Sequence, residues 1–241
     1  MPVIYRRILL KLSGEALAGE RGFGFDPETL DAAARVIADV VAMGVQTGIV
    51  IGGGNIFRGQ DSGLASDRVS ADHMGMLATY INSLALQGSI RRAGVSCSVL
   101  GSIGIAGVVE AFQAEKARAL LDEGSVVIFA GGTGCPFFTT DTAAALRALE
   151  IQAEALIKAT KVNGIYDKDP VKSPDAVFYP ELDYDQVLSE NLKVMDQAAI
   201  SLCRDNGLVV RVINIREPEN LKAMLAGEKI GSLVTARRDS K

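Results

Sequence analysis

Short apolar runs alternate with helix-like segments along the chain, and this rhythm restricts the fold more than any other feature. Several runs are almost wholly apolar, as expected for parallel strands that are covered on both faces. Strands that alternate with helices favour right-handed crossovers and a three-layer α/β/α sandwich with a mainly parallel central sheet. The expected strands lie at 8–12, 47–51, 96–100, 126–130, 155–157, 208–213 and 232–234.

The segments between the runs carry helix signals. Asp26 followed by Pro27 is typical of a helix start, and Gly44 is placed to end that helix. Further helices are expected at 70–92, 111–121, 141–151, 195–206 and 218–226, and residues 160–180 are expected to form a long ordered loop. We interpret residues 1–241 as a single α/β domain with an N-terminal lobe at about 1–154 and a C-terminal lobe at about 155–241.

Composition argues against several classes of protein. A net charge of −4, the absence of Trp and an aromatic content of 5% disfavour a nucleic-acid surface. The three cysteines form no CxxC pair, which disfavours a zinc site or a disulfide framework. No apolar run approaches the ~18–20 residues of a membrane span, and the Arg6-Arg7 start is broken by Lys11 before any signal-like apolar stretch develops. We therefore expect a cytoplasmic protein without nucleic-acid or membrane partners.

Polar and glycine-rich segments follow the expected strands, at the edge where open α/β sheets bind ligands. Gly52-Gly53-Gly54 leaves room for an anion against the backbone, and Arg58 offers a planar fork to a phosphate. The alternative is a flexible turn. In the segment 131–141, Thr140 or Asp141 could bind a ligand or simply cap the following helix.

Two lysines end expected strands and could flank a phosphoryl group during transfer. Lys11 precedes Ser13-Gly14, and Lys158 ends a later strand. The alternative is that both are solvated surface lysines. The P-loop and dinucleotide fingerprints are missing, which disfavours a dehydrogenase, and the lone His73 is more typical of a packing residue than of a catalyst.

Five segments together resemble bacterial UMP kinases of the amino-acid-kinase family, in order and spacing. They are KLSGE (11–15), GGGNIFRG (52–59), DHMGMLAT (72–79), GTGCPFFTTD (132–141) and KATKVNGIYDKDP (158–170). The resemblance implies an amino-acid-kinase-like fold and the reversible transfer of the ATP γ-phosphate to UMP, with Mg²⁺ bound through the ATP phosphates and no protein metal site.

The same resemblance implies roles for individual residues. The candidate catalytic residues are Lys11, Asp141 and Lys158. The candidate ATP site comprises Lys11, Leu12, Ser13, Gly14, Thr160, Tyr166 and Asp169. The candidate UMP site comprises Gly53, Gly54, Arg58, Asp72, Thr133, Gly134, Cys135, Pro136, Phe137, Phe138, Thr139 and Thr140. The segment Gly19, Glu20, Arg21, Gly22, Phe23 and Gly24 resembles one that is linked to activation by GTP.

The resemblance also implies a homohexamer that UTP inhibits. Two positions depart from the family pattern: Cys135 stands where many members carry Asn, near the acceptor base, and Asn163 replaces a frequent Asp. Two rival functions remain open at this point. One is a relative that makes an acyl phosphate from carbamate or an amino acid, and the other is a nucleotide sensor that binds UTP without catalysis.

Overall fold

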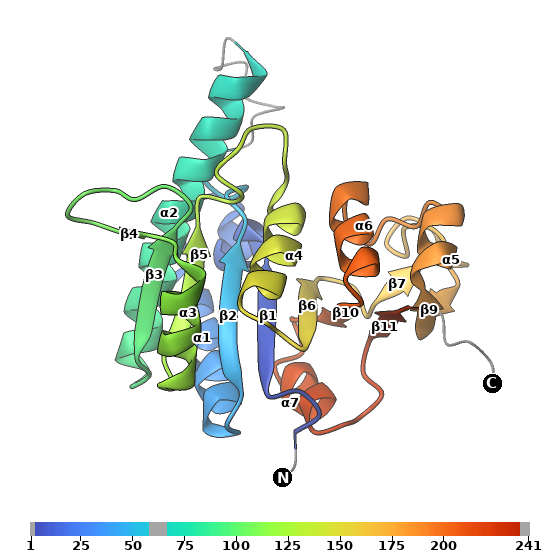
Figure 1. The fold of residues 1–241 in the computed structure, drawn as a ribbon. Helices are drawn as coiled ribbons and strands as arrows, with labels where there is room; N and C mark the ends of the chain where they lie inside the picture. Colours follow the sequence, from blue (N-terminus) through green and yellow to red (C-terminus); the bar gives the residue numbers. More distant parts are fainter. Residues whose placement is uncertain (1–2, 58–66, 237–241) are drawn as a thin grey trace.

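The computed structural model describes residues 3–57 and 67–236, and its centre is a nine-stranded sheet (Figure 1). The strand order across the described part of this sheet is β4-β3-β5-β2-β1-β6-β10-β11-β9. The strands are β1 (Arg7–Leu12), β2 (Gln46–Ile51), β3 (Cys97–Gly101), β4 (Glu110–Ala111), β5 (Val126–Ala130), β6 (Ala155–Thr160), β9 (Glu181–Asp183), β10 (Val209–Asn214) and β11 (Ser232–Thr235).

The strands from β4 to β10 run parallel to one another, and the direction reverses at the far edge. β11 pairs antiparallel with β10 and parallel with β9. The prediction of a mainly parallel sheet is confirmed. The two central strands β1 and β6 are paired through Ile8 with Ala155 and through Lys11 with Lys158. Their carboxyl ends therefore lie side by side in the middle of the sheet.

Helices cover both faces of the sheet and make the predicted three layers (Figure 1). One hydrophobic core joins the sheet to α1, α2 and α7, and a second core joins the opposite face to α3, α4, α5 and α6. The helices are α1 (Pro27–Ala42), α2 (Arg68–Arg92), α3 (Ala114–Asp122), α4 (Thr140–Glu150), α5 (Tyr184–Ser189), α6 (Gln197–Asp205) and α7 (Glu219–Leu225). In the described residues, no helix combines the length and the apolar character that crossing a bilayer requires.

Alternation along β1 decides which face carries the candidate catalytic lysine. Leu10 and Leu12 belong to the core beneath α1 and α2, whereas Leu9 belongs to the core beneath α4. Because successive side chains of a strand point to opposite faces, Lys11 lies on the same face as Leu9. The lysine therefore emerges next to α4.

Some short elements were not predicted. The segment expected to be a long loop contains β7 (Ile165–Tyr166) paired antiparallel with β8 (Phe178–Tyr179). The strands β4 and β9 and the helix α5 were also missed, because elements of two to six residues are too short to show a periodic pattern. Two 3-10 turns, η1 (Gly14–Leu17) and η2 (Gly19–Arg21), follow β1.

Candidate active site

Two lysines and one aspartate form a compact charge cluster where β1, β6 and α4 meet. The register that pairs Lys11 with Lys158 brings both ammonium groups to the same side of the sheet. Asp141, in the first turn of α4, bridges them: its Oδ1 lies 2.7 Å from Nζ of Lys11, and its Oδ2 lies 2.7 Å from Nζ of Lys158. All three side chains are largely buried, with exposed fractions of 11%, 13% and 17% for Lys11, Asp141 and Lys158.

Burial and neighbouring charges act against each other on this cluster. Burial opposes ionisation of Asp141, but the attraction of Lys11 and Lys158 outweighs it, and the net effect lowers the pKa of Asp141. For Lys158, burial is the largest effect and lowers the pKa; Lys11 acts in the same direction, and Asp141 opposes both. The cluster thus holds an ionised carboxylate between two cations, leaving net positive charge for an anionic ligand.

The amino-terminal turn of α4 is fixed by a second carboxylate. Thr139 is the N-cap, because its hydroxyl accepts from the backbone N–H of Asp141; the alternative in which Thr140 or Asp141 caps this helix is therefore excluded. The Thr139 hydroxyl also donates to Asp196, which caps α6 by accepting from the N–H of Ala199. These bonds tie α4 to α6 and set the position of Asp141.

A cavity of about 510 Å³ opens beside the charge cluster, between the glycine turn after β2, α2 and the segment after β5. Its lining includes eight of the predicted UMP-site residues: Gly53, Gly54, Asp72, Thr133, Cys135, Phe138, Thr139 and Thr140. It also includes residues that were not assigned to a site from the sequence, namely Phe57, Asp67, Arg68, Ala71, Gly75, Met76, Thr79 and Gly132. The missed residues of α2 share the face that carries Asp72, and a helical projection from Asp72 would have found several of them.

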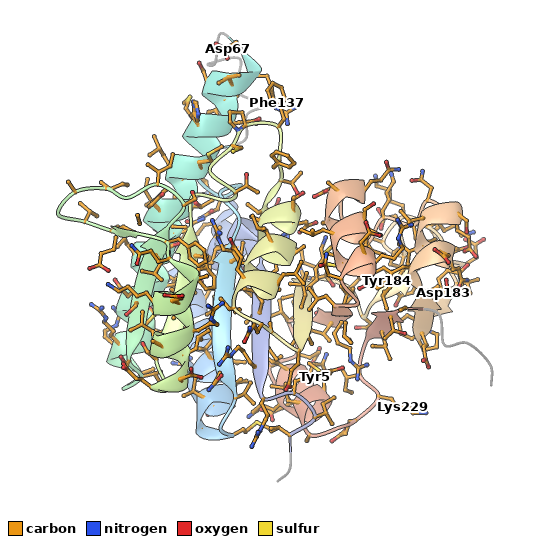
Figure 2. All side chains as sticks on the ribbon, viewed as in Figure 1. Tyr5, Asp67, Phe137, Asp183, Tyr184 and Lys229 are labelled. Atoms are coloured by element: carbon orange, nitrogen blue, oxygen red, sulfur yellow. The ribbon has the colours of Figure 1, made fainter. Side chains whose placement is uncertain are left out.

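One wall of this cavity is held at the tip of α2. The Asp72 carboxylate accepts a hydrogen bond from the backbone N–H of Phe137 at 2.7 Å and pairs with Arg68 at 2.9 Å. Phe137 has a φ of 72°, a conformation that non-glycine residues rarely adopt. Figure 2 shows Phe137 beside the amino-terminal turns of α2. Asp72 therefore fixes the loop 131–138 in addition to lining the cavity.

A second cavity, of about 730 Å³, lies on the other side of the cluster. The catalytic candidate Lys158 and three predicted ATP-site residues, Thr160, Tyr166 and Asp169, line it. Its lining also contains Lys168, Lys172 and Lys193, which were given no role from the sequence because isolated charges in irregular segments look like a solvated surface. The basic lining suits a polyanion such as a nucleoside triphosphate.

The remaining predicted site residues fall into three groups. Leu12 ends β1, and Ser13 and Gly14 follow it; the Ser13 side chain caps η1 by accepting from the N–H of Ala16 at 3.3 Å. Gly134, Pro136 and Phe137 belong to the loop 131–138 but are not among the residues that line the 510 Å³ cavity. The prediction for Arg58 lies outside the described residues.

Comparison with known proteins places this geometry in a family. A sequence model of the amino acid kinase family matches residues 6–214. The chain belongs to the amino acid kinase family. This amino acid kinase is 52% identical to a uridylate kinase from Pseudoalteromonas atlantica, over 95% of the chain and 94% of that protein.

Solved structures agree with this placement. The UMP kinase from Bacillus anthracis superposes with a TM-score of 0.93 at 40% identity, covering 99% of this chain and 98% of that one. The UMP kinase from Ureaplasma parvum superposes with a TM-score of 0.89 at 35% identity, covering 95% of this chain and 98% of that one. The predicted fold class is confirmed for this amino acid kinase.

Proposed function

We propose that this chain is a UMP kinase that transfers the γ-phosphate of ATP to UMP, giving UDP and ADP reversibly. The observation that carries the proposal is the Lys11–Asp141–Lys158 cluster, which lies beside two cavities. The lining of one cavity includes most of the predicted UMP-site residues, and the lining of the other is rich in lysine. Relatives at about half identity over nearly the whole chain are uridylate kinases, which supports the same conclusion.

The proposed reaction needs no general base. The attacking oxygen belongs to a phosphate whose second pKa is about 6, so most of it is already ionised at neutral pH. The difficulty is electrostatic, because two polyanions must approach in line; two unit charges at ~4 Å repel by about 4 kcal/mol at an effective dielectric of 20. Lys11 and Lys158 supply the positive charge that offsets this repulsion, and Asp141 orients both lysines.

The proposed division of labour follows the two cavities. Residues 1–154 supply the acceptor side, with Gly53, Gly54 and the loop 131–140 around UMP and Arg58 on its phosphate. Residues 155–241 supply most of the ATP side, through Thr160, Tyr166 and Asp169 around the base and ribose. Lys11, Leu12, Ser13 and Gly14 approach the ATP phosphates from the end of β1.

Mg²⁺ is proposed to enter with ATP. In the described residues, no group of three or more His, Cys, Asp or Glu side chains is arranged to hold a metal ion. Asp141 faces a lysine with each of its oxygens, so it is occupied as a charge partner. The phosphate oxygens of ATP are suitable hard ligands, and a bound Mg²⁺ neutralises part of their charge.

An ADP-release assay with ATP and Mg²⁺ tests the function directly. UMP, CMP, dUMP, carbamate and N-acetylglutamate are offered in parallel. Strong turnover with UMP alone is expected. Turnover with CMP as well would keep the proposed phosphoryl transfer but remove the selectivity for uracil. Turnover with carbamate or N-acetylglutamate instead would replace the proposal by an acyl-phosphate kinase, and tight UTP binding without any turnover would replace it by a sensor.

The lowered pKa of Lys158 predicts an early alkaline limit of activity. A lysine whose pKa is lowered is half deprotonated at a pH below 10.5. The midpoint of the alkaline fall in kcat/KM for ATP should therefore lie below that pH. Lys158→Arg is the control, because a guanidinium stays charged and should move this limb to higher pH. Ionisation of the uracil ring affects the wild type and Lys158→Arg equally. If the two plots of kcat/KM against pH coincide, the proton on Lys158 is not essential for activity.

The expected homo-oligomer, a hexamer by resemblance, is supported by an exposed apolar stripe on α2. Met74, Leu77, Ile81 and Leu84 are exposed, and their spacing of three or four residues puts them on one face of the helix. Apolar side chains gathered in this way on a surface commonly mark a protein contact. α2 is also the helix whose amino-terminal end extends past the sheet (Figure 1).

Replacing Leu77 by glutamate should break this assembly. A charge in the middle of the stripe would be buried without a partner in the contact, so analytical ultracentrifugation should show a smaller species than the wild type. Val171→Glu is the control, because Val171 is also an exposed apolar residue but is not part of α2. An unchanged mass for Leu77→Glu would remove the stripe from the interface.

Regulation and location complete the proposal. Inhibition by UTP, activation by GTP through residues 19–24, and a cytoplasmic location are expected from the resemblance. A contact supports a link between residues 19–24 and the acceptor side: the backbone N–H of Gly24 donates to the carbonyl of Asn55 at 2.8 Å. Movement of this segment would thus displace Asn55, which directly follows the glycine turn 52–54.

A further inference from the structure

Two buried side-chain amides link the glycine turn 52–54 to α2, and the proposed reaction does not use them. Asn55 follows the glycine turn 52–54, and Asn82 lies in the middle of α2; their exposed fractions are 1% and 0%. Each amide donates to the other, with Nδ2 of Asn55 3.0 Å from Oδ1 of Asn82 and Nδ2 of Asn82 2.7 Å from Oδ1 of Asn55. The two residues therefore form a closed pair, which we call the amide pair.

The second N–H of each amide reaches a different segment of backbone. Nδ2 of Asn82 donates to the carbonyl of Gly52 at 2.6 Å, on the acceptor side. Nδ2 of Asn55 donates to the carbonyl of Gly24 at 2.8 Å, and the N–H of Gly24 returns a bond to the carbonyl of Asn55. Both amides thus use their full donor capacity, and the amide pair joins α2, the glycine turn 52–54 and the segment 19–24.

The turn after β1 packs directly on the same pair. A Cβ atom placed on Gly14 would lie 2.4 Å from Oδ1 of Asn55 and 2.6 Å from the carbonyl oxygen of Gly52, closer than side-chain atoms can approach. The N–H of Gly52 in turn donates to the carbonyl of Leu12 at 3.0 Å. The donor-side turn and the acceptor-side turn therefore meet at the amide pair without any intervening side chain.

We propose that Asn55 and Asn82 are positioning residues that set the separation of the donor and acceptor phosphate turns. This inference rests on the proposed phosphoryl transfer. Phosphoryl transfer depends on the in-line approach of two bound groups, and a misplacement of about 1 Å can cost about a hundredfold in rate. A reciprocal pair of amides suits the task, because it fixes both distance and orientation without adding charge between the two phosphate turns.

The same pair connects the segment 19–24 to the acceptor side. Gly24 is bonded to the backbone and to the side chain of Asn55, so a displacement of Gly24 must move Asn55 or break two hydrogen bonds. Asn82 resists that displacement from α2. Loss of Asn82 should therefore loosen Gly24 as well as the turn 52–54.

The test compares Asn82→Ala with the wild type and with Ser89→Ala. Ser89 is equally buried on α2 and bonds to the Arg92 side chain, away from both phosphate turns. For Asn82→Ala we expect kcat to fall by about 30- to 100-fold at saturating ATP and UMP. The assay temperature is kept well below the melting temperature of the variant. Dissociation constants for UMP and ATP, measured by calorimetry, should change by less than about threefold. Hydrogen exchange at Gly24 should accelerate by about tenfold, as expected for the loss of one supporting hydrogen bond.

Several outcomes would overturn the inference. A lower melting temperature with kcat within threefold of the wild type would make the amide pair a core element only. Weaker nucleotide binding with unchanged kcat would make it a binding element. If Asn82→Ala does not fold, Asn82→Thr, which nearly conserves volume and puts one hydroxyl in place of the amide, carries the same measurements. A wild type that fails to phosphorylate UMP would refute the proposed function, whereas the exchange at Gly24 would still report on the amide pair.

Discussion

Replacing Lys11 by alanine is expected to lower kcat by about a thousandfold, while the KM for UMP changes by less than about threefold. The ammonium group of Lys11 lies 2.7 Å from Asp141, and Lys11 is not among the residues that line the 510 Å³ cavity proposed for UMP. Its charge is needed most when negative charge moves between the two nucleotides, and groups that act in that way typically contribute a factor of 10²–10³ or more. Steady-state kinetics with each substrate varied in turn would measure the effect.

Lys222→Ala is the matched control for Lys11→Ala. Lys222 is also a lysine in ion pairs, with Asp39 and Glu219 each at 3.0 Å, but it lies on α7 in the opposite helical layer. Its replacement should leave kcat within about twofold of the wild type, because exposed ion pairs contribute little. A Lys11→Ala enzyme with normal kcat would refute the proposed role of Lys11.

Replacing Asp141 by asparagine should damage both stability and turnover. The change keeps the shape of the side chain but leaves Lys11 and Lys158 facing each other without a neutralising charge. Removing one partner from a buried ionic group commonly costs about 3–5 kcal/mol, so we expect the free energy of unfolding to fall by about 3 kcal/mol at neutral pH. Because the lysines lose their orientation, kcat should fall by about a hundredfold.

The sign of the pH dependence gives a further check on Asp141. Its pKa is lowered in the folded protein, so its contribution to stability is present above pH 3.8 and is lost as the pH falls through the folded-state pKa. The stability difference between Asp141→Asn and the wild type, measured by urea denaturation, should therefore shrink on acidification. Asp39→Asn, which removes an exposed pairing to Lys222, should change stability by less than about 1 kcal/mol. Equal stabilities of wild type and Asp141→Asn at pH 7 would contradict the bridging role.

The sequence was sufficient for the parts of the fold that repeat a pattern. Apolar runs such as 126–130 predicted buried parallel strands, and Gly52-Gly53-Gly54 predicted a site at the end of one of them. The roles of Lys11 and Lys158 were suggested because each ends a strand, but their pairing depends on the order of strands in the sheet. That order places residues almost 150 positions apart on neighbouring strands, which local periodicity does not encode.

The contacts between elements were the part that the sequence did not reveal. Asp196 and Asn82 were not singled out, because one reads as an ordinary helix cap and the other as a polar residue in a helix. Their importance appears only when Asp196 is seen to hold Thr139, and when Asn82 is seen to bond to Asn55 and Gly52. Both act across elements that are distant in the chain, so residue type and spacing carry no signal for them.

The origin of the charge cluster has a consequence for how this architecture diversifies. Lys11 and Lys158 extend from the two central strands, where the backbone is held on both sides, whereas most of the lining of the 510 Å³ cavity comes from α2 and the segment 132–140. A substitution at the periphery can therefore alter which acceptor is admitted while the machinery that neutralises charge stays in place. Acceptor preference and catalytic activity are separable in such a molecule. Mutations in the cavity lining can change the preferred acceptor while the ability to transfer a phosphoryl group is retained.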